Sequence, residues 1–178
     1  MALTATVFNF DIDLSDTDRN VYETLSIHMA QHPSESDEYL VARLLAYLLE
    51  YQEGIAFSRG VSEPEEPTIS VRDLTGAIRT WIEIGTPDAT RLHKASKTGA
   101  RVAVYCHKEG AQWLKGLAAA GIHRADALQL FALDRSLIAQ LVARLDRRMS
   151  FSVSITDREL YVSIGNDNLT GVTEALQI

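Results

Sequence analysis

The sequence predicts an α+β protein in which a central mixed sheet is flanked by helices, with an extra strand at the N-terminal end and a hairpin at the C-terminal end. Three observations lead to this prediction. Short runs such as Ala5–Leu14 alternate between polar and apolar residues, which is typical of half-buried strands. Longer runs carry an apolar stripe at helical spacing behind a capping residue. Near the middle, a strand, a helix and a strand follow in order, which favours a parallel pair with a right-handed crossover.

The first third of the chain is expected to contain one strand and two helices. The strand is Ala5–Leu14. Ser15 or Asp16 can cap a helix that runs to about Gln31 and ends before a proline, because the residue before proline is pushed out of the helical conformation. Ser34 is expected to cap the second helix, Glu35–Glu53, whose apolar stripe consists mainly of leucines.

Three short strands are predicted for the middle of the chain. They are Ile55–Ser58, Thr68–Arg72 and Ala77–Gly85. The prolines and acidic residues of stretch 62–67 predict a loop between the first two strands. Asp73-Leu74-Thr75-Gly76 has the composition of a hairpin turn, so the last two strands are expected to pair.

The remaining elements alternate between helices and strands before a final hairpin. Thr86 and Pro87 are expected to begin the next helix as its cap and first residue. The expected elements are the helix Pro87–Thr98, the strand Arg101–Cys106, the helix Glu109–Ala120, the strand Ala127–Leu133, the helix Asp134–Leu145 and the hairpin strands Ser150–Ile155 and Glu159–Ile164. No pattern predicts structure after Gly165.

Length and composition predict one globular domain in a reducing compartment. The chain has 178 residues, and a domain of this size buries about 70% of the unfolded chain's surface without disulfides. We therefore expect residues 1–178 to form a single domain. The one cysteine, Cys106, lies in a predicted strand and is expected to be a buried thiol. Because no signal-like segment and no run of about 18 apolar residues is present, the sequence predicts a cytoplasmic protein without a membrane segment.

Charge is unevenly distributed along the chain. The formal net charge is −7, which argues against a general nucleic-acid coat. Met1–Thr68 has 3 basic and 13 acidic residues, whereas Ile69–Ile178 has 14 basic and 11 acidic residues. Between Arg72 and Lys108 there are seven basic residues and three acidic ones, so an anionic partner such as nucleic acid is expected to dock there. A solvated helix face with scattered arginines explains the same charges equally well.

Glu83 is the main candidate for a functional residue. In its predicted strand, Ile82 and Ile84 occupy one face, whereas Trp81 and Glu83 occupy the other, so a lone charge interrupts an apolar run. A buried carboxylate is costly unless it is paired or bound to a metal. The strand is therefore expected to deliver Glu83 to a site.

The register of the predicted hairpin selects a carboxylate partner for Glu83. A two-residue turn at Thr75-Gly76 places Thr68 opposite Glu83 and brings Glu66 to the same face of the sheet, about 7–8 Å away along the diagonal. A three-residue turn with a bulge at its glycine favours Glu65 instead. Two carboxylates at such a spacing can bridge through a divalent cation.

Further residues complete a predicted site for Mg²⁺ or Mn²⁺. Glu38 lies near the start of the second helix, where an acid also complements the helix dipole. Lys94 lies about two helical turns beyond the strand that carries Glu83. Carboxylates without imidazole or thiolate suit Mg²⁺ or Mn²⁺, and a metal with an adjacent lysine can promote phosphodiester hydrolysis. The expected phosphate or substrate contacts are Arg59, Arg91 and Lys97.

The order of elements from residue 35 to residue 106 resembles the αβββαβ core of the PD-(D/E)XK nuclease superfamily. Local motifs are more narrowly similar to the YaeQ family, a group of small bacterial proteins with a nuclease-like core. The similarity runs through about Tyr105 with specific motifs and more loosely to the end. The motifs are Asp18-Arg19-Asn20, His32-Pro33-Ser34-Glu35, Arg43-Leu44-Leu45-Ala46, Phe57-Ser58-Arg59-Gly60, Asp73-Leu74-Thr75-Gly76, Trp81-Ile82-Glu83-Ile84-Gly85 and Pro87-Asp88.

The resemblance implies a nuclease motif that is altered at two positions. Pro67 matches the proline of the motif, and Glu83 matches its second acid. Thr68 occupies the position of the metal-binding aspartate, and Gly85 occupies the position of the lysine. The replacements that the resemblance implies are Glu66 for the aspartate, Lys94 for the lysine and Glu38 for an acid on the first core helix.

Two functions follow as alternatives. The first is a divalent-metal-dependent phosphodiesterase or nuclease with a migrated active site. The second is a catalytically degenerate nuclease-like module that binds nucleic acid or a protein partner. A role in transcription, a third alternative, has no support in the residues.

Overall fold

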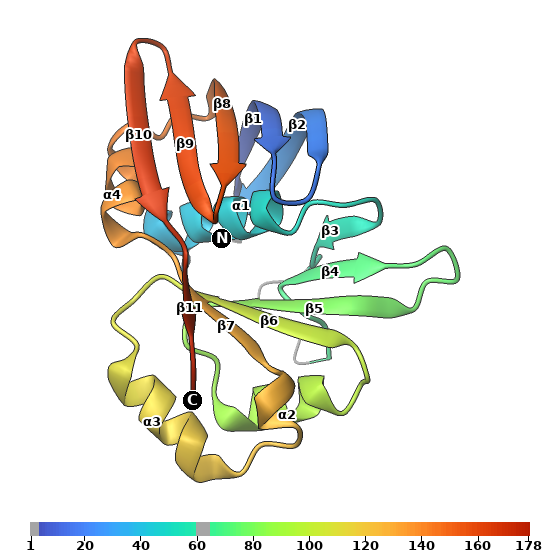
Figure 1. Ribbon diagram of the computed structural model, residues 1–178. Coiled ribbons are helices and arrows are strands. Elements are labelled where there is room, and N and C mark those ends of the chain that lie inside the picture. Colours follow the sequence, from blue (N-terminus) through green and yellow to red (C-terminus); the bar gives the residue numbers. More distant parts are fainter. Residues whose placement is uncertain (1–3, 60–64) are drawn as a thin grey trace. The chain divides into compact units, whose positions relative to one another are not determined.

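The chain forms two compact units, each built on its own mixed sheet. The computed structural model in Figure 1 describes residues 4–59 and 65–178. Unit 1 comprises Met1–Leu49 and Asp134–Thr173, and unit 2 comprises Glu50–Leu133 and Glu174–Ile178. The described residues include four α-helices and two mixed sheets, which confirms the predicted α+β class. The assignment of 1–178 to one domain stays a prediction.

Unit 1 contains a five-stranded sheet in the order β10-β9-β8-β1-β2. β1 pairs antiparallel with β2 and parallel with β8. The helices of this unit, α1 and α4, lie on one side of the sheet (Figure 1). The elements are β1 (Thr6–Asp16), β2 (Val21–Gln31), α1 (Asp37–Leu49), α4 (Arg135–Ala143), β8 (Arg148–Thr156), β9 (Glu159–Ile164) and β10 (Asp167–Val172).

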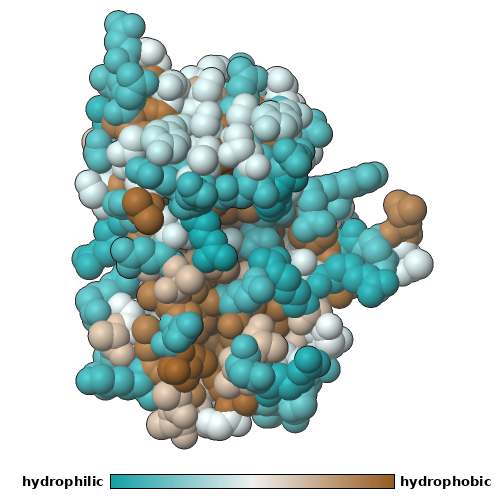
Figure 2. Space-filling model, in the orientation of Figure 1, coloured by the Kyte–Doolittle hydropathy of each residue, from teal (hydrophilic) through white to brown (hydrophobic). Residues whose placement is uncertain are grey.

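The two faces of this sheet differ sharply in polarity. Alternate residues of β1, from Phe8 to Leu14, are buried. The residues between them include Asp11 and Asp13, which are exposed and lie beside exposed serines of β8 in the parallel register. In Figure 2 the surface over these strands is mostly pale or teal, as expected for serine, threonine and aspartate side chains. One face therefore packs in the core of unit 1 and the other meets solvent.

The helix predicted for residues 15–31 is wrong, because β2 occupies most of this segment. Leu25, Ile27 and Met29 are buried at alternate positions, and β2 pairs with β1 along its whole length. The Asp16 carboxylate accepts hydrogen bonds from the backbone N–H groups of Asp18 and Arg19 at 3.0 and 3.3 Å. A helix cap makes similar bonds, so the same residue favours a helix start in the sequence and closes a hairpin in the structure.

The two histidines of this segment contact different partners. His28 lies on β2 and contacts the side chain of Asn9, whereas His32 follows the strand and hydrogen bonds to Ser34.

Unit 2 contains a six-stranded sheet in the order β11-β7-β6-β5-β4-β3. β3, β4 and β5 pair antiparallel, and β5, β6 and β7 pair parallel. Helices therefore connect the parallel strands, as the strand–helix–strand order predicts. The elements are β3 (Ile55–Phe57), β4 (Ile69–Arg72), β5 (Ile78–Ile84), α2 (Ala89–Ser96), β6 (Arg101–Cys106), α3 (Ala111–Ala120), the 3₁₀ turn η1 (Ala125–Ala127), β7 (Gln129–Ala132) and β11 (Glu174–Leu176).

The core on one face of this sheet is built around Trp81. Trp81 is 2% exposed, and it packs with Leu92 of α2, Leu117 of α3 and the strand residues Val102 and Val104. The predicted faces of β5 are thus confirmed, because Trp81 and Glu83 share the side that the helices cover. Cys106 is buried, as predicted.

Beyond the turn, the β4–β5 register matches the one predicted from a two-residue turn, although the turn itself closes between Asp73 and Ala77, where the Asp73 N–H donates to the Ala77 carbonyl. Ile69 pairs with Ile82 and Val71 with Thr80, and an irregularity follows at Arg72. The same register, continued by one residue, places Thr68 opposite the next residue of β5, Glu83. The predicted loop at 62–67 lies partly outside the described residues.

Helix starts differ slightly from prediction. Ser36, not Ser34, bonds to the first turn of α1, and Asp88, not Thr86, caps α2 through the backbone N–H of Arg91 at 2.8 Å. Asp134 caps α4, as the sequence suggests. Among the described residues, no helix is long and apolar enough to cross a membrane.

Candidate functional site

The Glu83 carboxylate is buried and fully engaged within unit 2. Glu83 is 3% exposed. Its Oε1 accepts the indole N–H of Trp81 at 2.7 Å and lies 2.8 Å from the Arg91 guanidinium. Its Oε2 accepts the hydroxyl hydrogen of Thr68 at 3.1 Å. A buried carboxylate is stable only when it is paired and hydrogen bonded, and both conditions hold here.

Three local features position these partners. Trp81 and Glu83 are two residues apart on a strand, so their side chains point to the same face. Thr68 directly precedes β4, and the β4–β5 register places it opposite Glu83. Arg91 is placed by α2, where the Asp88 cap sets the first turn. A hairpin and the helix that follows it therefore assemble the whole group.

Arg91 and Lys94 tie the segment before β4 to α2. The Arg91 Nη2 donates a hydrogen bond to the backbone carbonyl of Glu66 at 2.8 Å. One turn later, Lys94 forms an ion pair with the Glu65 carboxylate. These side chains are 44% and 76% exposed, so the Lys94–Glu65 pair is a surface contact that contributes about 0–1 kcal/mol. Of the two alternatives, Glu65 is thus the acid that contacts Lys94.

The remaining predicted site residues are exposed. Glu38 lies in the first turn of α1 and belongs to unit 1, whereas Glu83 belongs to unit 2. Lys97 is the C-cap of α2, and Arg59 follows β3. No group of three or more His, Cys, Asp or Glu side chains suited to a metal ion is found among residues 4–59 and 65–178. The Mg²⁺ or Mn²⁺ site with Glu83, Glu66 and Glu38 as ligands stays a prediction.

Arg91 has protein partners that the sequence did not predict. Its guanidinium lies against Glu83 and the Glu66 carbonyl, and its side chain is 28% exposed; the phosphate contact stays a prediction. The signal that could have identified these partners is the position of Arg91. Arg91 is the first basic residue of the helix that follows the Glu83 strand, and Glu83 needs a cation.

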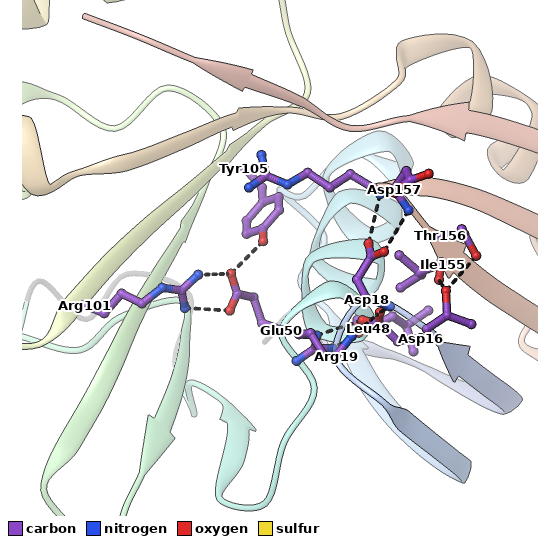
Figure 3. A network of polar contacts seen from close by, with 12 residues as sticks. Asp16, Asp18, Arg19, Leu48, Glu50, Arg101, Tyr105, Ile155, Thr156 and Asp157 are labelled. Carbon is purple, nitrogen blue, oxygen red and sulfur yellow. Dashed lines mark hydrogen bonds and ion pairs between the residues drawn. The ribbon is translucent and has the colours of Figure 1, made fainter.

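A second buried carboxylate, Glu50, was not predicted. Figure 3 shows its bidentate ion pair with Arg101, at 2.8 Å for both N–O contacts, and the Tyr105 hydroxyl donating to it at 2.6 Å. Arg101 and Tyr105 lie at odd positions of β6, on the face opposite Val102 and Val104. Glu50 raises the pKa of Arg101, mainly through these hydrogen bonds. The Glu50 carboxylate, the Arg101 guanidinium and the Tyr105 hydroxyl therefore form a hydrogen-bonded network that stabilises unit 2.

Comparisons with known proteins agree on one family. The model of the family described as YaeQ protein matches residues 1–172. An uncharacterised protein YaeQ of Escherichia coli strain K12 is 33% identical over 171 residues, which cover 95% of this chain and 94% of the relative.

Two crystal structures of YaeQ proteins are also similar to this chain. The protein from Xanthomonas axonopodis pv. citri is 36% identical, with a TM-score of 0.88 over 98% of this chain and 99% of that one. The protein from Pseudomonas syringae is 28% identical, with a TM-score of 0.88 over 98% and 97%. The sequence, its motifs and its fold together show that the chain belongs to the YaeQ family.

Proposed function

We propose that this chain is a nuclease-like binding protein that binds nucleic acid and in which Glu83 has a structural role. The observation that carries this proposal is the 2.8 Å contact between Arg91 and Glu83, within a group where Trp81 and Thr68 supply the other hydrogen bonds. In a metal-dependent nuclease, the catalytic carboxylate must have an oxygen available to bind the metal ion. Here a guanidinium already supplies the positive charge that the metal would bring.

The nuclease-like character rests on element order and on the altered motif. The order α1-β3-β4-β5-α2-β6 follows the αβββαβ arrangement, with an antiparallel run and then a parallel crossover. Thr68 stands in place of the aspartate and binds Glu83 directly. Gly85, in place of the lysine, has φ of 92°, a conformation that a lysine rarely adopts. These features support a motif that no longer serves catalysis.

Nucleic acid is the partner that the exposed cations favour. Lys94 and Lys97 lie on one helix, and Arg59 is exposed in the same unit. The ion pair of Lys94 with Glu65 is exposed, and a phosphate can replace it at little cost. Lysine and arginine contacts to the phosphate backbone supply most non-specific affinity for nucleic acid.

The test is fluorescence anisotropy with labelled single-stranded and double-stranded oligonucleotides over a range of salt concentrations. A variant with Lys94→Gln and Lys97→Gln is expected to bind more weakly and to reduce the salt slope by about two, because each lysine contributes about one unit. The matched control carries Lys115→Gln and Arg135→Gln, which removes the same charge elsewhere. If the wild type does not bind at low salt, or if both variants behave alike, nucleic-acid binding is refuted and a protein partner is favoured.

A metal-dependent phosphodiesterase is the second candidate, and one observation favours it. Arg91 and Lys94 hold Glu66 and Glu65 against the helix that also contacts Glu83. Three of the predicted acids, Glu65, Glu66 and Glu83, therefore contact Arg91 or Lys94 of α2, whereas Glu38 belongs to unit 1. Cleavage of an oligonucleotide that requires Mn²⁺, is lost in Lys94→Ala and is retained in Lys97→Ala would favour this candidate over simple binding.

A further inference from the structure

The hairpin between β4 and β5 projects beyond the rest of the sheet of unit 2 (Figure 1). β3 pairs with β4 only as far as Val71, and β5 pairs with β6 only from Thr80 onward. Segment 72–79 therefore lies beyond both neighbouring strands of the described sheet. Its turn contains the motif Asp73-Leu74-Thr75-Gly76, to which the contacts around Glu83 give no role.

Leu74, at the tip of this hairpin, is the most exposed large hydrophobic side chain of the described residues. It is 100% exposed, whereas the next, Tyr22, is 58% exposed. Figure 2 shows a hydrophobic group at the end of the projecting hairpin, between hydrophilic flanks. Removing a leucine side chain from water is favourable, so a partner that covers Leu74 gains affinity from it.

The turn holds Leu74 in a fixed position. The Asp73 carboxylate accepts hydrogen bonds from the backbone N–H groups of Thr75 and Ala77 at 2.9 and 3.1 Å, and from the Thr75 hydroxyl at 2.6 Å. The backbone N–H of Asp73 donates to the Ala77 carbonyl, and that of Gly76 donates to the Asp73 carbonyl, each at 3.0 Å. A loop that is ordered before it binds loses less conformational entropy on binding, so the turn is preorganised to present Leu74.

Arginines on both strands of the hairpin flank the tip. Arg72 is exposed and donates a hydrogen bond to the Gly76 carbonyl at 3.0 Å. In the described part of the chain, no carboxylate forms an ion pair with it. Arg79 is 72% exposed and neutralises Asp73 through an ion pair at 2.7 Å. The charge of Arg72 is thus left over beside an apolar side chain, which favours a partner with negative charge beside an apolar interior.

The tip lies at the same end of the unit 2 sheet as Lys97. Thr80, near the start of β5, pairs in the parallel register with Arg101, the first residue of β6. Lys97 is the C-cap of α2, the helix that leads into β6, and it is exposed. A duplex that contacts Lys97 is therefore at the end of the sheet from which the hairpin projects.

We propose that Leu74 inserts between two stacked base pairs of duplex DNA, while Arg72 and Lys97 contact phosphates on either side. The insertion rests on the proposed nucleic-acid binding and specifies its substrate as a deformable duplex. Many DNA-binding proteins insert an apolar side chain, leucine included, between base steps from the minor groove, which unstacks and kinks the duplex. A pyrimidine–purine step such as TA is the easiest to unstack. Base faces then cover the leucine, and the phosphates beside them match the cations.

The test uses a short DNA duplex with 2-aminopurine at a central TA step and fluorescein at one end. The fluorescence of 2-aminopurine rises when the base loses its stacking, and the anisotropy of fluorescein reports binding itself. Saturating wild-type protein is expected to raise the 2-aminopurine fluorescence. The rise is expected to be smaller when the TA step is replaced by a stiffer A-tract.

Three variants and a control connect the rise to the hairpin. Leu74→Gln is expected to abolish the rise but to keep the wild-type salt slope, because the slope counts phosphate contacts. Its urea midpoint is expected to match the wild type, since the side chain is fully exposed. Leu74→Met is expected to retain the rise, because methionine also serves as a wedge. Arg72→Gln is expected to retain the rise at saturation and to reduce the salt slope by about one. Ile178→Gln, which replaces another exposed apolar side chain of unit 2, is expected to change neither quantity.

The outcomes separate the insertion from nucleic-acid binding as such. If the wild type binds no nucleic acid, the proposed function and the insertion are both overturned. If it binds only single strands, or binds the duplex without a rise in 2-aminopurine fluorescence, the insertion alone is overturned. The same holds if Leu74→Gln gives the same rise as Ile178→Gln.

Discussion

Replacing Arg91 by methionine tests whether the Arg91–Glu83 pair stabilises unit 2. The substitution removes the cation beside Glu83, whose side chain is 4% exposed, and it also removes the hydrogen bond from Arg91 to the Glu66 carbonyl. Breaking a buried ion pair by removing one partner costs about 3–5 kcal/mol. Thr68 and Trp81 still bond to Glu83, and Arg91 itself is 28% exposed, so we expect a smaller loss of about 2–3 kcal/mol.

Urea unfolding followed by tryptophan fluorescence measures this loss, because Trp81 and Trp113 both belong to unit 2. The matched control is Lys97→Met, an exposed cation on the same helix, which is expected to change the free energy of unfolding by less than about 0.5 kcal/mol. Adding Glu83→Gln to Arg91→Met should recover part of the loss, with a coupling of about 1–2 kcal/mol. A wild-type unfolding curve for Arg91→Met, or zero coupling, would refute the reasoning.

Four further predictions follow from local geometry. Gly116→Ala in α3 is expected to stabilise by about 0.5–1 kcal/mol, since nothing lies within 4 Å of the added Cβ and alanine favours the helix; a lower melting temperature would contradict this. Gly54→Ala is expected to cost at least about 2 kcal/mol, because its Cβ would lie 2.2 Å from the Arg72 carbonyl oxygen at a φ of 91°; unchanged unfolding would count against it. Tyr105→Phe removes the hydroxyl that donates to a buried carboxylate and is expected to cost about 1.5–3 kcal/mol in urea unfolding; a loss below experimental error would mean that the bond contributes nothing. The Thr75 hydroxyl, followed by other donors, lowers the pKa of Asp73 from 3.8 to about 2, so its stabilising contribution is complete above pH 3.8 and is lost as pH falls towards 2; NMR titration of the carboxyl carbon checks this, and a midpoint near 3.8 would contradict it.

The sequence predicted unit 2 well because its signals are local. The alternation around Glu83 placed Trp81 on the same face, and the turn residues located the β4–β5 hairpin, whose register is set together with an irregularity at Arg72. Both follow from the period of a strand and from turn chemistry. The Arg91–Glu83 contact depends on how α2 packs on the sheet, and spacing along the chain does not determine that packing.

Unit 1 was harder to predict because its pairings are distant in the sequence. β1 pairs in parallel with β8, more than 100 residues later in the chain. The Asp16 cap signal suits both a helix and a hairpin, and only the long partner strand β1 decides between them. Tail strands β10 and β11 carry weak patterns and form on sheets that other segments provide. Glu50 likewise could not be predicted as a buried ion-pair partner, because its partner Arg101 lies 51 residues away in the sequence.

Calorimetric titration of the wild type and Glu83→Gln with Mn²⁺ tests the central claim most directly. If Arg91 neutralises Glu83, the two proteins are expected to give the same heats, with no binding that depends on the carboxylate. Saturable Mn²⁺ binding to the wild type that disappears in folded Glu83→Gln would contradict the structural role of Glu83 and favour the metal-dependent enzyme.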